Sequence, residues 1–243
     1  MKKLFIYLFI LSGFSCFAQD ETIAWDYPVK PGTEEWKSFK SRPEMVDACQ
    51  VPGSILKIID TKSLAELCFN YPLIHDINAF NILQKGFDHV TDDFNGFTEL
   101  FQRQDVGKVL LERYMAINAM KVKDIQTSFQ KGLYIANLSL LELFLSQNRV
   151  IIKLSKEEKY KLIEEASSKF KSKKQYAKNY GLWGMRTTPL LMGRIMRFDK
   201  YQEFDNLISD NNTVAASLET GSLYDFDVME EIVNKAQDYL NFK

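Results

Sequence analysis

From Pro43 to the end of the chain, apolar side chains recur about every 3.6 residues, and no long segment alternates apolar and polar residues as a half-buried strand would. Turn signals such as Asn95-Gly96 and the residues before Pro72 separate the periodic segments. The pattern predicts an all-α fold of roughly nine to eleven helices with short connections. We expect stacked helical hairpins in an irregular α-α superhelix rather than a regular bundle.

Two long helices are expected in the middle of the chain. The segment from Ile125 to Leu145 is apolar on most of its surface, which predicts a central helix covered by several neighbours. Ser155 and Glu158 have the spacing of a capping box and open a second helix that runs to about Asn179. Its lysines are interpreted as a solvated outer face, with a docking patch for an acidic partner as the alternative. These lysines are Lys156, Lys159, Lys161, Lys169, Lys171, Lys173, Lys174 and Lys178.

The first eighteen residues have the layout of a secretory signal peptide. Lys2 and Lys3 precede an apolar run, and small side chains at Cys16 and Ala18 fit a cleavage site after Ala18. The run is about half of the ~20 residues that a bilayer-spanning helix needs, and no comparable segment follows it. We therefore expect an exported chain, periplasmic or extracellular, with no integral membrane segment after cleavage. The alternative is a lipid anchor on Cys16.

The remainder is predicted to be one domain with an N-terminal arm. Residues 19–42 hold Pro28 and Pro31 and form the arm, which Trp25 and Tyr27 are expected to fasten to the body. Residues 43–243 form a single all-α domain. Two cysteines remain after cleavage, Cys49 and Cys68. They form a disulfide in one interpretation and pack as small apolar side chains in the other.

Charge and composition exclude several classes of function. The chain has 31 basic and 32 acidic residues, which argues against nucleic-acid binding. His75 and His89 are its two histidines, so a Ser-His-Asp or Cys-His mechanism would have to use one of them. Asp88, His89, Asp92 and Asp93 could share a helix face as metal ligands, but surface charges are the preferred interpretation. No catalytic residue, metal or cofactor is predicted.

One segment has an unusual composition. Residues 180–197 combine a tryptophan with three methionines, three glycines and three arginines, which is typical of adaptable binding surfaces. A tight helix crossing is the alternative. The candidate binding residues are Trp183, Arg186, Met192, Arg194 and Arg197. An interface here would require at least two of the three arginines, with Met192 or Met196, to be exposed and contiguous.

The function predicted from this segment is binding of a protein or peptide partner by a module that is not an enzyme. Two features support it: the superhelical pattern and the scarcity of catalytic side chains. The alternative is a carboxylate-dependent hydrolase that uses Asp88, Asp92 or Asp93.

Several segments of the first half resemble an uncharacterised family of secreted all-helical bacterial proteins. They are Tyr27-Pro28, residues 31–36, residues 49–52, residues 64–72 and residues 88–96. The family has no assigned activity. The resemblance therefore implies export and a helical fold, and it carries over no functional residue.

Overall fold

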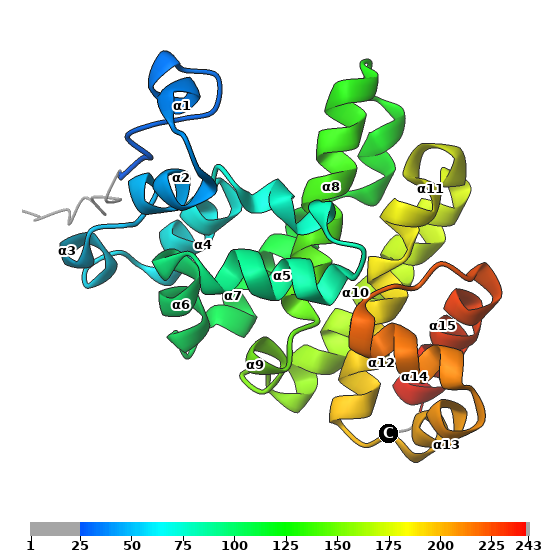
Figure 1. The fold of residues 1–243 in the computed structure, drawn as a ribbon. Coiled ribbons are helices and arrows are strands. Elements are labelled where there is room, and N and C mark those ends of the chain that lie inside the picture. The colour runs from blue at the N-terminus through cyan, green and yellow to red at the C-terminus, as the bar shows by residue number, and fades with distance from the viewer. Residues whose placement is uncertain (1–24, 242–243) are drawn as a thin grey trace, which may run out of the picture.

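The computed structural model describes residues 25–241, and the regular elements of this part of the chain are all helical (Figure 1). The all-α prediction is confirmed. The signal peptide, its cleavage site and Cys16 lie outside the described residues. The elements are α1 Glu34–Ser38, α2 Arg42–Ala48, α3 Gly53–Leu56, α4 Thr61–Phe69, the 3-10 helix η1 Ile74–Ala79, α5 Leu83–Asp92, α6 Asn95–Gln102, α7 Val106–Ala116, η2 Ala119–Lys123, α8 Ser128–Leu145, α9 Asn148–Ile151, α10 Lys156–Gln175, α11 Ala177–Met185, α12 Thr187–Phe198, α13 Gln202–Asp210, α14 Asn212–Thr220 and α15 Phe226–Asn241.

The described residues contain fifteen α-helices, more than the sequence pattern predicts. Several of them, such as α3 and α9 with four residues each, are too short to show a period. The capping box at the start of α10 is confirmed, because Ser155 and Glu158 exchange both hydrogen bonds. These bonds satisfy two backbone N–H groups that would otherwise lack a partner at the helix start.

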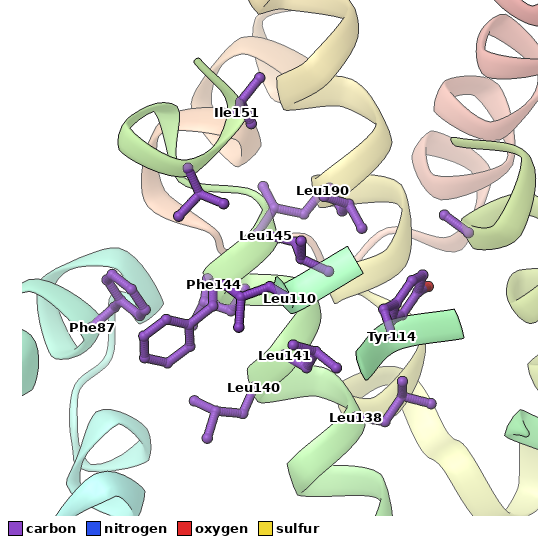
Figure 2. Packing of buried hydrophobic residues seen from close by; sticks show 14 of the residues in the cluster. Phe87, Leu110, Tyr114, Leu138, Leu140, Leu141, Phe144, Leu145, Ile151 and Leu190 are labelled. Carbon is purple, nitrogen blue, oxygen red and sulfur yellow. The ribbon is translucent and has the colours of Figure 1, made fainter. Parts of the chain in front are cut away.

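The central helix is α12, not α8. It packs against α8, α9, α10, α11, α13, α14 and α15, and Met192 and Met196 are fully buried in it. Only the second half of α8 lies in the core, where Leu141 is fully buried and Phe144 packs against Phe87 (Figure 2). The first half extends away from the body (Figure 1), and Phe129 on it is 80% exposed. The prediction that this segment is the central helix is therefore wrong, although α8 does pack against several neighbours, among them α7, α11 and α12.

The N-terminal arm contacts the body through Tyr27. Its hydroxyl donates to the carbonyl of Leu67 at 2.9 Å, and its ring lies 5.0 Å from that of Trp25. Cys49 and Cys68 nearby are free, fully buried thiols, so in this structure they pack as small apolar side chains. Burial raises the pKa of Cys49 to about 11 and that of Cys68 well above its usual value. Among the described helices, none combines the length and apolar character that a bilayer crossing requires.

Candidate functional site

An apolar pocket of about 470 Å³ lies between η1, α8, α11 and α12. We call it the α8–α11 pocket. On the α8 side it is lined by Gly132, Ile135, Ala136, Ser139, Leu140 and Leu143, which share one helix face at spacings of three and four residues. Ile74, Ile77 and Leu83 close it from the η1 side. Because three of the α8 residues are small, that face leaves space against its neighbours.

A break in α11 shapes the opposite wall. Gly181 has φ +58° and ψ −178°, a backbone conformation that is essentially restricted to glycine. No atom other than its neighbours lies within 4 Å of the place where a Cβ would stand, so the backbone alone requires glycine here. The break separates Tyr180, which is buried, from Trp183, which lines the pocket and is 53% exposed.

Arg186 follows α11 and also lines the pocket. It is only 2% exposed, and its Nε and Nη1 have no hydrogen-bond acceptor among the described residues. The guanidinium carbon lies 3.7 Å from the ring centroid of Trp183 and 5.0 Å from that of Tyr224. Burial lowers the pKa of Arg186, although arginine stays charged at neutral pH. The pocket therefore has a buried positive charge in its wall.

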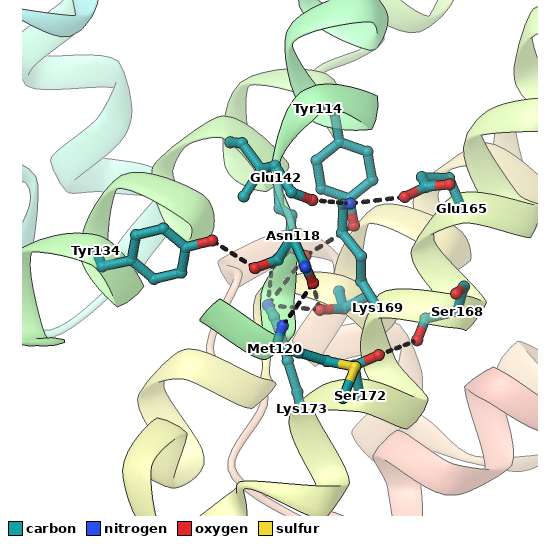
Figure 3. Close-up of polar contacts among 12 residues, drawn as sticks. Tyr114, Asn118, Met120, Tyr134, Glu142, Glu165, Ser168, Lys169, Ser172 and Lys173 are labelled. Atoms are coloured by element: carbon teal, nitrogen blue, oxygen red, sulfur yellow. Dashed lines mark hydrogen bonds and ion pairs between the residues drawn. The ribbon is translucent and has the colours of Figure 1, made fainter. Parts of the chain in front are cut away.

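A buried ion pair between Glu142 of α8 and Lys173 of α10 lies beside this wall (Figure 3). Both side chains are fully buried. Lys173 Nζ donates to the two carboxylate oxygens at 3.0 and 2.8 Å, to the carbonyl of Gly184 at 2.8 Å and to Thr188 Oγ1 at 2.9 Å. Glu142 also accepts from the hydroxyls of Tyr114, Thr187 and Thr188. Every polar atom of the pair has a partner.

This network positions Arg186. Gly184 precedes it, Thr187 and Thr188 follow it, and all three are held by Glu142 or Lys173. Burial lowers the pKa of Lys173, while the nearby Glu142 charge opposes that shift. Because the ion pair is saturated with hydrogen bonds and closed to solvent, we assign it a structural role.

The five candidate binding residues do not form one surface. Trp183 and Arg186 meet at the α8–α11 pocket, and their binding role stays a prediction. Met192 and Met196 are both fully buried in the core, so the expectation that one of them is exposed beside the arginines is wrong. Arg194 and Arg197 line a second space, a polar cavity of about 660 Å³ that also borders Asp88, Asp92 and Arg149.

Arg194 and Arg149, which line the polar cavity, already have partners within the protein. Arg194 Nε donates to the carbonyl of Leu218 at 2.8 Å, and its Nη1 donates to Ser146 Oγ at 3.2 Å. Arg149 lies over the ring of Phe101, 3.6 Å from the centroid, and donates to Thr91 Oγ1. Burial lowers the pKa of Arg194 to about 10. These contacts explain the arginines as ties between helices.

The residues considered as metal ligands are dispersed. Asp93 pairs with Arg42, and His89 lies 3.7 Å from Asp93. Asp88 accepts from Gln84, while Asp92 is exposed. Among the described residues, no three histidine, cysteine, aspartate or glutamate side chains are grouped as a metal ion would require.

Comparison of the chain with protein-family models, with curated proteins and with solved structures gave no match. The resemblance to secreted helical bacterial proteins therefore stays a prediction. The fold and the two cavities are the basis for a functional assignment.

Proposed function

We propose that this chain is a non-enzymatic binding protein that takes an apolar group of its partner into the α8–α11 pocket. The pocket itself carries the proposal. Its volume of about 470 Å³ falls within the range of about 300 to 1,000 Å³ that is usual for ligand sites. Its lining combines aliphatic side chains with the rings of Tyr180 and Trp183. The polar groups in the lining are His75, Asn78, Ser139, Asn179, Arg186 and Thr187.

A peptide or protein partner suits the surroundings of the pocket. Leu133 on α8 and Leu182 and Trp183 on α11 are large apolar side chains left exposed. Exposed apolar residues next to a concave site are typical of surfaces that bind a partner. The proposal includes export from the cell, as the leader suggests, and a superhelical stacking of the hairpins that places the pocket on a concave face.

The experiment that tests this proposal uses a variant with a larger side chain on the α8 wall of the pocket. We expect the neutral apolar dye N-phenyl-1-naphthylamine to bind the wild type with increased fluorescence. Ala136→Phe places a ring in the pocket and should weaken this binding at least tenfold. The matched control is Ala216→Phe, at an exposed position of α14 outside the pocket. Equal binding by Ala136→Phe and the wild type would refute the site.

A second candidate function is a carboxylate-dependent hydrolase, and one observation favours it. Asp88 and Asp92 both border the polar cavity, while Asp93 is paired with Arg42. Hydrolysis of 4-nitrophenyl esters or phosphates by the wild type, lost in the Asp88→Asn/Asp92→Asn variant, would support it. We place it second because both carboxylates are exposed on α5 and arginines line the same cavity.

A further inference from the structure

We propose that the ligand of the α8–α11 pocket is an apolar acid, whose carboxylate binds the guanidinium of Arg186. This inference rests on the proposed function and names the chemistry of the ligand. Its starting point is the unusual state of one buried charge. Among the described residues, the buried cationic residues are Lys169, Lys173 and Arg186.

Two of these cations have a carboxylate. Lys169 pairs with Glu165 at 2.6 Å, and Lys173 pairs with Glu142 at 2.8 Å. No carboxylate lies within ion-pair distance of Arg186 among the described residues. A buried charge without a counter-ion is unfavourable, because the protein does not replace the water that the group has lost. An anion from outside the chain would correct this imbalance.

The position of Arg186 makes such an anion part of the same ligand. Arg186 lines a pocket whose α8 wall is mostly apolar, and His75 and Asn78 add polar groups on the η1 side. A ligand with an apolar body would fill the space between α8 and η1, and its acidic group would meet Arg186. Arginine is well suited to this role, since its planar donors match the two oxygens of a carboxylate.

The rings of Trp183 and Tyr224 cover the guanidinium of Arg186. Their ring centroids are 6.3 Å apart at 71°, and each ring faces the guanidinium. Both are about half exposed, so little of the core would have to move for either ring to shift. Gly181, two residues before Trp183, supplies a backbone position at which α11 can bend. We infer that Trp183 moves aside when the acid binds.

The proposal predicts a difference between an acid and its neutral analogue. Isothermal titration at pH 7 would compare 4-phenylbutyrate with 4-phenyl-1-butanol, which has the same apolar body. We expect the acid to bind the wild type at least tenfold more tightly. In Arg186→Met the two should bind with equal affinity, and the alcohol should bind as it does to the wild type. Lys161→Met, an exposed cation of α10 outside the pocket, should retain the wild-type preference.

The source of the carboxylate is resolved by a second pair of compounds. An acetylated tripeptide ending in phenylalanine would be titrated with its C-terminus free and amidated. Tighter binding of the free form than of 4-phenylbutyrate indicates a peptide C-terminus, and the reverse indicates a small organic acid.

Each further outcome decides a separate question. If acid and alcohol bind the wild type equally, the assignment to Arg186 is wrong and the apolar pocket stands. If N-phenyl-1-naphthylamine and both phenylbutyl compounds fail to bind the wild type, the proposed function fails and the acid with it.

Discussion

Lys173 of α10 and Arg186, which stands between α11 and α12, are both buried cations. They differ in the partners that surround the charge. Lys173 has the Glu142 carboxylate, the hydroxyl of Thr188 and the carbonyl of Gly184 around it. Arg186 has two aromatic rings, a side-chain hydrogen bond with Tyr224 and two nitrogens without an acceptor. The first arrangement is complete within the chain, whereas the second is completed by an anion that the described residues do not supply. Completeness of hydrogen bonding thus separates a structural charge from a binding charge.

The largest effect is expected at the complete site. Lys173→Met leaves the Glu142 carboxylate buried without its counter-ion, so the free energy of unfolding should fall by about 3–5 kcal/mol. Equilibrium unfolding in urea measures it. A loss below about 1 kcal/mol would show that the ion pair does not hold α8, α10 and α12 together.

A double variant tests whether the two charges depend on each other. Glu142→Leu/Lys173→Met removes both charges, so its loss should be smaller than the sum of the two single losses by at least about 2 kcal/mol. Additive losses would mean that each residue acts alone, contrary to the network seen in Figure 3.

The next effect concerns the break in α11. Gly181→Ala forces a side chain into a backbone conformation reserved for glycine, which should destabilise the protein by about 1–3 kcal/mol. The matched control is Gly132→Ala, because this helical glycine of α8 also faces open space. That change should instead stabilise α8 by about 0.5–1 kcal/mol. If both variants raised the midpoint temperature of thermal denaturation by the same amount, the break in α11 would not require glycine.

The smallest effect on stability is expected at the incomplete site. Arg186→Met removes a buried charge that has no carboxylate, so the unfolding free energy should change by less than about 1 kcal/mol. Arg194→Met is the comparison, because its lost bonds to Leu218 and Ser146 should cost about 1–3 kcal/mol. A larger loss for Arg186→Met than for Arg194→Met in urea unfolding would show that Arg186 is itself a structural tie.

The sequence contained part of this result. Its periodicity predicted the helices and its capping box predicted the start of α10, since both depend on neighbours in the chain. It also contained a signal that was misinterpreted. Lys169 and Lys173 fall on the same α10 face as Leu162, Ala166 and Phe170, all of which are buried. Lysines on an apolar face indicate buried ion pairs rather than a solvated surface.

The residues that these buried side chains contact could not be predicted from the local pattern. Glu142 stands out as a charge in an apolar helix, but the sequence does not show that α8 and α10 bring it to Lys173. The burial of Met192 has a similar cause, because α12 is surrounded by helices from distant parts of the chain. Trp183 and Arg186 were found by composition alone, and the pocket that joins them depends on the contact of η1 with α8 and α11.

If an acidic ligand satisfies the charge of Arg186, its binding must stabilise the folded wild type more than it stabilises Arg186→Met. The unfolding free energy of the wild type and of Arg186→Met would be measured with and without saturating 4-phenylbutyrate. A ligand at 100 times its Kd stabilises the folded state by about 2.7 kcal/mol. We predict a gain of this order for the wild type and a much smaller gain for Arg186→Met. Equal stabilisation of both proteins would contradict the account.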